Sequence, residues 1–274
     1  MAIALSGPLV LVGAGKMGGA MLAGWLARGL DPKLVLVQDP GPPPEVSTLL
    51  KQHGIAVHAT LPASMPEPAV LLIAVKPQVM EDVFPAVAKR AGPSTVVLSI
   101  AAGRTIASFA KHLPAHTAII RSIPNTPAAV GRGITVCCPN PHVLPAQRDL
   151  ATELLSAIGQ VGWVEDESLI DTATAVSGSG PAYVFLLAEC LAHAGVEAGL
   201  DPKLARQLAD ATVAGSGELL RLSGEDPATL RRNVTSPNGT TAAALEVLMA
   251  PGGMEALMDR AVAAATKRSR ELSA

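Results

Sequence analysis

A short stretch in the C-terminal half of the chain combines a tight turn with several hydroxyl side chains. Residues 234–241 read Val-Thr-Ser-Pro-Asn-Gly-Thr-Thr and lie between two helical patterns. A Pro-Asn-Gly turn that runs into a helix leaves unpaired backbone N–H groups at the helix N-terminus, where an anion is stabilised. Hydroxyl groups beside the turn can donate further hydrogen bonds. The stretch therefore predicts a binding site for a small molecule that carries a carboxylate.

A glycine-rich turn near the N-terminus indicates a second ligand. Gly13, Gly15 and Gly18 form a G-x-G-x-x-G motif between an apolar run and a helical pattern. In this motif the first glycine permits a tight turn, the second lets the backbone approach a pyrophosphate, and the third allows close packing of helix and strand. We expect a bound dinucleotide whose phosphates rest on the helix N-terminus at Lys16 and Met17.

The kind of dinucleotide depends on Asp39, which ends the second predicted strand. An acidic side chain about 20 residues after the motif usually hydrogen-bonds the ribose 2′-hydroxyl of NAD, and its charge repels the 2′-phosphate of NADP. No Arg or Lys follows before Lys51. The local sequence therefore admits NADH or NADPH but favours NADH. The alternative is that Asp39 only caps the turn before Pro40.

A parallel sheet must position the glycine turn. Residues 9–164 alternate β-rich runs with helical stretches, several runs being continuously apolar, as in strands covered on both faces. The pattern predicts a Rossmann-type doubly wound, mostly parallel α/β sheet as a dinucleotide-binding domain over residues 1–164. The predicted strands span 9–12, 34–38, 70–75, 96–100, 118–123, 134–138 and 162–164. The predicted helices span 17–28, 45–53, 80–89, 105–112 and 146–158.

The remaining residues, 165–274, read as an all-helical domain for dimerisation and substrate binding. The predicted helices span 183–194, 202–222, 227–232, 241–249 and 254–270. Asp201 and Asp226 each precede a proline, which is typical of an N-cap followed by the first helical residue. The run 183–194 is apolar nearly all round, so we expect it to be buried on every side. Packing against its copy in a second chain would bury it.

Residues at the ends of other predicted strands should lie at the same edge of the sheet as the glycine turn. Small residues there let a planar ring approach closely. Lys76 could lie near the nicotinamide ribose or attract a carboxylate, and the alternative is an ordinary solvated lysine. The residues expected to face the cofactor at these strand ends are Ala74, Val75, Lys76, Pro77, Ala101 and Asn125.

The amino-acid composition of the chain limits the kinds of partner that it is expected to bind. The net charge is −2 and no large basic block occurs, so nucleic acid is not expected as a partner. No run of about 20 apolar residues is free of glycine, proline and charge, so no membrane partner is expected either. Charged residues make up only 16% of the chain against 49% hydrophobic ones, which indicates apolar surface hidden in an oligomer. The three cysteines fit neither a disulfide framework nor a metal site, so we expect buried, reduced thiols, no metal and a cytoplasmic protein.

The chain resembles the pyrroline-5-carboxylate reductases along essentially its full length. The matching motifs are Gly13–Gly18, Ala74–Pro77, Arg121–Pro127, Ala175–Tyr183 and Val234–Thr241, of which the last two are specific. The resemblance implies NAD(P)H-dependent hydride transfer to the imine of 1-pyrroline-5-carboxylate, giving L-proline. It also implies an intertwined homodimer, often assembled further into decamers, with an active site built from both subunits.

The resemblance also assigns roles to residues. The protonated imine is already a good hydride acceptor, so the protein needs only to orient it and to anchor its carboxylate. Thr241 is implied as the hydrogen-bond partner of the ring nitrogen. The other implied substrate contacts are Ser236, Gly239 and Thr240 for the carboxylate, Asn233 and Lys76 as supporting groups, and Ser179 facing the pocket.

One residue departs from the family pattern. The family usually has Gly-Gly after Pro237, whereas this chain has Asn238 and Gly239. Asparagine is the non-glycine residue that best tolerates the left-handed region at the third position of a type II turn. We predict that the turn survives with Asn238 at positive φ.

Two alternative functions remain. The chain could reduce a different substrate, such as a small keto acid or a six-membered cyclic imine carboxylate, because ring size is read by pocket shape. It could also be a non-catalytic NAD(P)-binding regulatory dimer. The hydroxyl-rich stretch 234–241 argues against a regulator, since a sensor needs no second anion site. A substrate panel separates these functions.

Overall fold

The computed structural model describes residues 3–273, which form two compact units. The first unit runs to Gly178 and also includes the chain from Thr266 onward. The second unit comprises Ser179–Ala265.

The segment just after residue 164 belongs with the sheet because its short helix is anchored there. In α6 (Leu169–Ala173) the side chain of Ile170 is buried in a cluster with Ile123 and Cys138 of the sheet. The first unit therefore extends past the change of composition at residue 164, where the sequence places the end of the dinucleotide-binding domain.

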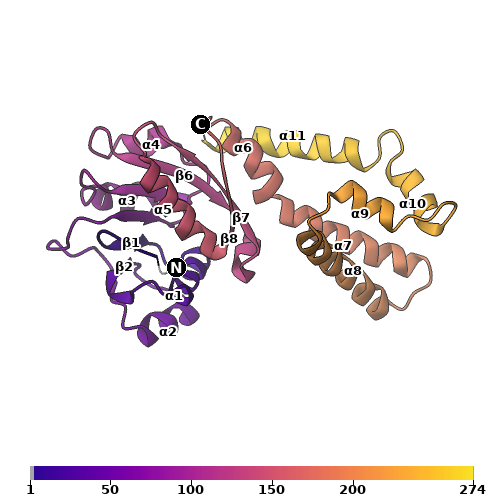
Figure 1. Cartoon of the computed structure of the whole chain (residues 1–274), viewed down its shortest axis with the longest axis horizontal. Helices are drawn as coiled ribbons and strands as arrows, with labels where there is room; N and C mark the ends of the chain where they lie inside the picture. Colours follow the sequence, from indigo (N-terminus) through magenta and orange to yellow (C-terminus); the bar gives the residue numbers. More distant parts are fainter. Residues whose placement is uncertain (1–2, 274) are drawn as a thin grey trace. The chain divides into compact units, whose positions relative to one another are not determined.

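An eight-stranded sheet forms the centre of the first unit (Figure 1). The strand order is β3-β2-β1-β4-β5-β6-β7-β8, and neighbours are parallel except β6 and β7. The predicted doubly wound, mostly parallel sheet is confirmed, although β3 is too short for a sequence pattern to show. The strands are β1 (Leu9–Val12), β2 (Val35–Gln38), β3 (Val57–His58), β4 (Val70–Ile73), β5 (Val96–Ser99), β6 (Ala118–Pro124), β7 (Gly133–Pro139) and β8 (Gly159–Trp163).

Different helices cover the two faces of the sheet. In β1, Leu11 faces a core that contains Trp25, whereas Val10 faces the opposite core, which contains Phe84. Because both faces are buried, the strand is apolar at every position. The first face is covered by α1 (Lys16–Ala27), α2 (Pro44–Gln52) and α5 (Pro145–Leu155), and the second by α3 (Met80–Ala88) and α4 (Ile106–Ala110).

Short turns of helix complete the connections of this unit. The 3₁₀ turns are η1 (Pro32–Leu34), η2 (Pro77–Val79), η3 (Thr126–Val130) and η4 (Ser156–Ile158), and η5 (Thr174–Gly178) is π-helical. The sheet reverses its strand order at β1, which pairs with β2 on one side and β4 on the other. Ligands of open α/β sheets bind at the carboxyl ends of the strands at such a reversal.

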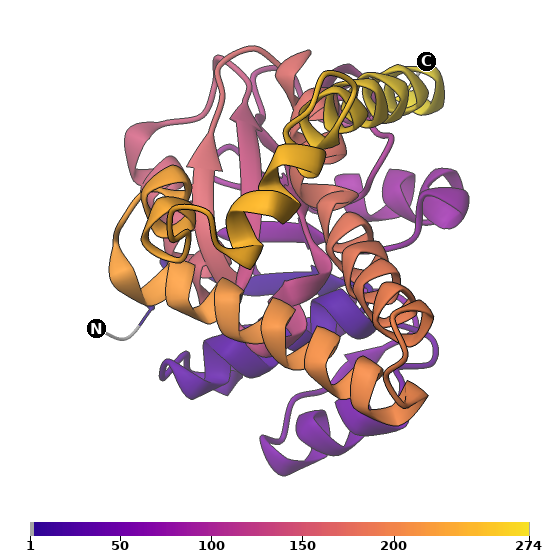
Figure 2. The same cartoon turned by 90° about the vertical axis from the view of Figure 1, so that its right-hand side faces the viewer.

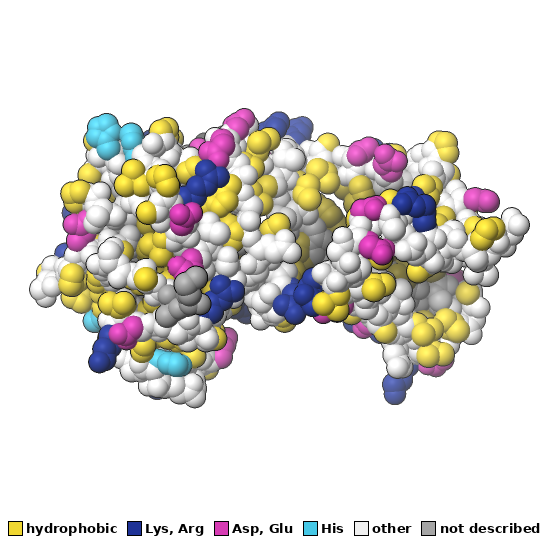
Figure 3. All heavy atoms as spheres, in the orientation of Figure 1, with side chains coloured by type: hydrophobic (Ala, Val, Ile, Leu, Met, Phe, Trp, Pro, Cys, Tyr) yellow, Lys and Arg dark blue, Asp and Glu magenta, His cyan; other side chains and the backbone are white. Residues whose placement is uncertain are grey.

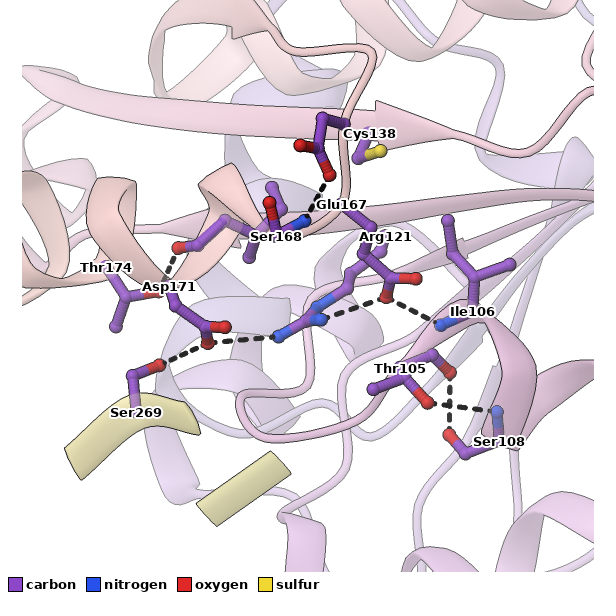
Figure 4. Close-up of polar contacts among 12 residues, drawn as sticks. Thr105, Ile106, Ser108, Arg121, Cys138, Glu167, Ser168, Asp171, Thr174 and Ser269 are labelled. Carbon is purple, nitrogen blue, oxygen red and sulfur yellow. Dashed lines mark hydrogen bonds and ion pairs between the residues drawn. The ribbon is translucent and has the colours of Figure 1, made fainter. Parts of the chain in front are cut away.

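A buried cluster of charges ties distant segments to β6 (Figure 4). Arg121 is 5% exposed, with its Nη1 2.9 Å from Glu167 Oε1 and its Nη2 3.9 Å from Asp171 Oδ1. The same Glu167 oxygen accepts the Ile106 N–H at 2.8 Å, and Asp171 accepts the Ser269 hydroxyl at 2.7 Å. Because Ser269 lies near the end of the chain, the cluster fastens that end to the first unit.

The second unit consists of helices, of which α7 and α8 pack against each other (Figures 1 and 2). Asp201 accepts the N–H groups of Lys203 and Leu204, and Asp226 accepts that of Thr229, so both predicted N-caps are confirmed. The helices are α7 (Gly180–Glu197), α8 (Pro202–Ser223), α9 (Pro227–Asn233), α10 (Thr240–Leu248) and α11 (Met254–Ser273), the last of which continues into the first unit.

The helices of the second unit expose many apolar side chains, and Figure 3 shows apolar side chains on one face of the molecule. No residue of the described helix α7 is buried, and Phe185 is 62% exposed in the single chain. The run 183–194, which the apolar pattern predicts to be buried on every side, is therefore not buried within the single chain. An exposed apolar surface of this kind is typical of an interaction site. The large apolar residues exposed on α7 and α8 are Val184, Phe185, Leu186, Leu187, Leu191, Leu204, Leu208, Leu219, Leu220 and Leu222.

Candidate active site: a glycine turn and a hydroxyl-rich helix N-terminus

The glycine turn after β1 has the geometry that a pyrophosphate needs. Gly13 has φ +93°, and a Cβ there would lie 2.8 Å from the backbone carbonyl of Ala74. A Cβ on Gly18 would collide with the carbonyl oxygen of Gly13. Around Gly15, by contrast, no atom of the described chain lies within 4 Å of an added Cβ. Two of the glycines are thus required by packing, whereas Gly15 leaves open space beside the backbone.

That open space lies at the start of α1. Gly15 is the N-cap in an extended conformation, and no side chain among the described residues caps the helix. The first intrahelical bond runs from the Gly19 N–H to the Gly15 carbonyl at 2.7 Å. The N–H groups of Lys16 and Met17 therefore have no partner in the first turn. A phosphate group fits this N-terminus in both charge and space.

Asp39 lies beside the same turn. One of its oxygens accepts the Ala14 N–H at 2.7 Å, and the other accepts the Gly41 N–H at 2.8 Å. Asp39 therefore caps the turn at Pro40 and also braces the glycine turn, a contact that the sequence did not predict. Each carboxylate oxygen has two lone pairs, so Asp39 can still accept a ribose hydroxyl.

The lysine expected at the strand end lies just beyond β4. The Ala74 N–H donates to the Val12 carbonyl at 2.7 Å, which keeps this strand end beside the end of β1. Lys76 is exposed, and no ion pair of the described chain engages it. Arg104 supports the adjacent turn by donating to the Pro77 carbonyl at 3.0 Å. Nothing in the sequence signals this role for Arg104.

Ala101 and Asn125 follow the ends of β5 and β6. Ala101 is buried, and its N–H donates to the Ser99 hydroxyl at 3.2 Å. Asn125 accepts the Ile134 N–H at 2.9 Å and donates to the Ser177 carbonyl at 3.1 Å. The side chain of Asn125 is thus engaged at both ends by the protein itself.

The stretch 234–241 forms the predicted turn and runs into a helix. The Gly239 N–H donates to the Ser236 carbonyl at 3.1 Å, and Asn238 has φ +58°, which confirms the predicted left-handed conformation. A Cβ on Gly239 would collide with the Ser236 hydroxyl oxygen, so a larger residue there would force this hydroxyl to turn away. Because the turn uses the Gly239 N–H, the groups left for an anion are the N–H groups that begin α10.

The helix that follows the turn has an uncapped N-terminus. Gly239 is the N-cap of α10, and no side chain in the described part of the chain caps it. Thr240 and Thr241 are the first two helical residues, so their N–H groups lie in the turn that lacks intrahelical acceptors. Their hydroxyl groups lie on the same first turn. Backbone N–H groups and hydroxyls in this arrangement are chemically suited to bind a carboxylate.

The two remaining predicted substrate contacts have different settings. Asn233 ends α9 and donates to Glu225 Oε2 at 3.1 Å, which holds its amide within the second unit. Ser179 is the residue just before α7. The predicted cofactor residues all lie in the first unit, and the predicted substrate residues other than Lys76 all lie in the second.

The prediction of buried thiols is confirmed for two of the three cysteines and is wrong for Cys190. Cys137 and Cys138 are buried in β7, and burial raises the pKa of the Cys138 thiol to about 11. Burial also raises the pKa of the Cys137 thiol. Cys190 lies exposed on α7. Within residues 3–273, no cluster of three or more His, Cys, Asp or Glu side chains could hold a metal ion.

Two family models match the chain. The model described as pyrroline-5-carboxylate reductase dimerisation matches residues 167–272. A model described as NADP oxidoreductase, coenzyme F420-dependent, matches residues 8–103. The first match covers the helical part of the chain, and the second covers the glycine turn and the strands around it.

Proteins of known identity match over nearly the whole length. A pyrroline-5-carboxylate reductase from Pseudomonas aeruginosa is 38% identical over 265 residues, which cover 97% of this chain and 96% of that protein. One from Synechocystis sp. is 42% identical over 265 residues, covering 96% of this chain and 97% of that protein.

Solved structures agree with the fold. The structure of a pyrroline-5-carboxylate reductase from Coxiella burnetii matches with a TM-score of 0.91 and 31% identity, covering 98% of this chain and 99% of that chain. The Plasmodium falciparum pyrroline carboxylate reductase, solved with NADP bound, matches with a TM-score of 0.78 and 26% identity over 98% and 99% of the two chains.

Proposed function

The chain belongs to the pyrroline-5-carboxylate reductase family, and we propose that it reduces 1-pyrroline-5-carboxylate to L-proline with NAD(P)H. The proposal rests on one observation: among the helix N-termini of residues 3–273 that have no side-chain cap, one lies at a glycine turn and another lies beside hydroxyl side chains. The first suits a pyrophosphate and the second suits a carboxylate.

The first unit has residues that fit a nicotinamide dinucleotide. Gly15 leaves room for the pyrophosphate, and the N–H groups of Lys16 and Met17 would bind it. When bound, the reduced nicotinamide supplies the hydride. The strand ends near Ala74 and Ala101 offer small side chains against which the planar ring can lie. Lys76 would supply positive charge at the same edge of the sheet.

The second unit has residues that fit the substrate. The N–H groups that begin α10 and the Ser236 hydroxyl would anchor the ring carboxylate, while the Gly239 N–H closes the turn on the Ser236 carbonyl. The Thr241 hydroxyl would accept a hydrogen bond from the protonated ring nitrogen. The hydride then forms the new C–H bond at the imine carbon, and the π electrons of the C=N bond become the nitrogen lone pair.

The chemistry requires orientation more than acid–base catalysis. The protonated form of the imine is already a good hydride acceptor, so the site needs no strong general acid. Holding two reacting carbons in contact supplies much of the rate enhancement by itself. This agrees with a site made of threonine, serine and backbone N–H groups.

We further propose that the exposed helices pair with a second copy of the chain. The dimerisation model matches residues 167–272, which include the apolar face of α7 and α8. By length and composition alone, one described stretch, Leu169–Glu197, is apolar enough to cross a membrane. We assign this apolarity to the dimer contact, because α7 is half of a hairpin whose other helix, α8, carries charged residues. Assembly of dimers into decamers and a cytoplasmic location complete the proposal.

Asp39 supports a preference for NADH. Its carboxylate lies at the glycine turn, and the residues after it, Gly41 to Pro44, supply no positive charge for a 2′-phosphate. At about 4 Å, two like charges repel by about 1–4 kcal/mol, depending on exposure. We therefore expect kcat/KM for NADH to exceed that for NADPH by at least about tenfold. A preference for NADPH of that size would contradict the role assigned to Asp39.

A panel of cyclic imines tests the proposed carboxylate site. The panel holds 1-pyrroline-5-carboxylate, 1-pyrroline without the carboxylate, and a six-membered imine carboxylate. Losing two charge-assisted hydrogen bonds costs about 3–6 kcal/mol, so 1-pyrroline should show a kcat/KM at least about a hundredfold lower. Equal turnover of the two five-membered imines would contradict the carboxylate site. Preference for the six-membered ring would favour the alternative substrate class.

A further inference from the structure

Strand β6 and the residue that follows it carry three side chains that hold the same distant segment, residues 167–177. Residues 121, 123 and 125 alternate along β6 and its end, so they share one face. Arg121 binds Glu167 and Asp171, and Ile123 packs in a cluster with Ile170. The third side chain of this row, Asn125, reaches the end of that segment.

Asn125 satisfies a carbonyl that the helix itself leaves without a donor. The Ser177 carbonyl would normally accept the N–H four residues later, but residue 181 is proline and has none. The next N–H, that of Ala182, donates to the Ser179 carbonyl at 3.0 Å. Asn125 Nδ2 donates to the Ser177 carbonyl at 3.1 Å instead.

The carbonyl lies in an unusual part of the helix. Residues Thr174–Gly178 form the π-helical turn η5, and the first compact unit ends at Gly178. Single π turns within α-helices recur at functional sites. Ser179, one of the proposed substrate contacts, follows directly. Asn125 therefore holds η5, the turn that directly precedes Ser179.

We propose that Asn125 is a positioning residue that acts on the substrate side of the reaction, rather than a ligand of the cofactor. The inference rests on the proposed reductase function, because its kinetic consequence is read with the imine. Asn125 Oδ1 holds the Ile134 N–H at 2.9 Å, so one amide side chain links β7, the end of β6 and η5. Loss of its donor frees η5 without disturbing the glycine turn.

Asn125→Asp is the sharpest test because it keeps the size and the acceptor of the side chain. The carboxylate can still accept the Ile134 N–H, but it faces the Ser177 carbonyl with an oxygen instead of an N–H donor. Asn140→Asp is the matched control. Asn140 accepts the Ile119 N–H at 3.1 Å and donates to the Thr117 carbonyl at 2.9 Å, at the opposite end of β6.

We expect Asn125→Asp to lower kcat/KM for 1-pyrroline-5-carboxylate at least tenfold, mainly through KM, while the Kd for NADH stays within twofold of the wild type. Amide hydrogen exchange over residues 178–184 should accelerate in this variant. Asn140→Asp should lower Tm by a similar amount but change neither kcat/KM nor that exchange by more than twofold.

Three results would overturn the inference. A parallel rise in Kd for NADH would make Asn125 a cofactor ligand after all. An equal fall of kcat/KM in Asn140→Asp would show that the fall in Asn125→Asp comes only from lower overall stability. Unchanged exchange over residues 178–184 would show that Asn125 does not hold the turn. Absence of imine turnover by the wild type would instead contradict the proposed function. Amide hydrogen exchange over residues 178–184 would then still show whether Asn125 holds the turn.

Discussion

Two glycines of the same turn should respond in opposite ways to the same substitution. Gly15→Ala and Gly18→Ala each add one methyl group to the G-x-G-x-x-G motif. The structure predicts that the first variant loses cofactor binding without losing stability, and that the second loses stability. The pair therefore separates the role of the turn in folding from its role in binding.

The Gly18 variant is destabilised by contact with backbone. The added Cβ would collide with the Gly13 carbonyl oxygen and lie 3.3 Å from its carbon and 3.4 Å from Leu11 Cδ1. Backbone cannot move aside as a side chain can, so α1 must shift away from β1. Because the overlap is with a backbone atom, the overpacking should cost about 2–3 kcal/mol, of which better helix propensity returns about 1 kcal/mol, leaving a net cost of about 1–2 kcal/mol. At about 2–4 °C per kcal/mol, Tm should fall by roughly 2–8 °C.

The Gly15 variant has no such conflict in the free protein. No atom of the described chain lies within 4 Å of the added Cβ, and φ at Gly15 is −71°, which alanine adopts freely. Alanine is a poorer N-cap than glycine but restricts the unfolded chain more, so the two effects offset to within about 1 kcal/mol. The methyl group does, however, occupy the space proposed for the pyrophosphate.

Thermal melting and titration of NADH fluorescence decide the matter. Gly15→Ala should keep the wild-type Tm to within about 3 °C and bind NADH at least about tenfold more weakly, which corresponds to about 1.4 kcal/mol. Wild-type affinity in Gly15→Ala would refute the position assigned to the pyrophosphate. An unchanged Tm in Gly18→Ala would refute the argument that α1 packs on β1 through this glycine.

Three further substitutions test other parts of the molecule. Thr241→Val removes one hydrogen bond to a charged nitrogen, so kcat/KM for the imine should fall about ten- to a hundredfold while the Kd for NADH stays unchanged. An equal loss of NADH binding would show that Thr241 does not act on the substrate alone. Asn238→Gly should change kcat/KM by no more than about twofold, because Asn238 serves the backbone at φ +58°, and a large loss would indicate that its side chain touches substrate. Arg121→Met leaves the buried Asp171 and the partly exposed Glu167 without their cation and should cost about 3–5 kcal/mol, or roughly 6–20 °C in Tm, whereas Arg206→Met on the exposed face of α8 should cost under about 1 kcal/mol; equal Tm values would contradict the importance of the Arg121 cluster.

The sequence predicts those parts of the fold that depend on local pattern. Continuous apolar runs indicate the buried strands, and the prolines after Asp201 and Asp226 mark the helix starts that the structure has. β3 is not predicted from the sequence, because a two-residue strand has no periodicity to detect. The change of composition at residue 164 does not mark the end of the first unit, since α6 is held there by contacts with strands far away in sequence.

In the candidate site, too, the sequence predicts the features that depend on local pattern and misses those that depend on distant contacts. The glycine spacing and the Pro-Asn-Gly turn are local, and their conformations follow from residue type, including Asn238 at positive φ. Contacts between distant residues carry no local signal. The Asp39 bond to Ala14, the Arg104 bond to Pro77 and the two bonds of Asn125 each join segments separated by many residues. Because its side chain makes these two bonds, we no longer assign Asn125 to the cofactor and propose that it holds η5 in place.

The proposed function requires that this chain transfer hydride to a cyclic imine carboxylate. The most direct test adds 1-pyrroline-5-carboxylate to the purified protein with NADH and, separately, with NADPH, and follows both the loss of absorbance of the reduced nicotinamide and the formation of proline. We predict equal amounts of proline formed and NADH oxidised, with NADPH used less efficiently. Absence of proline with either nucleotide would contradict the proposed function.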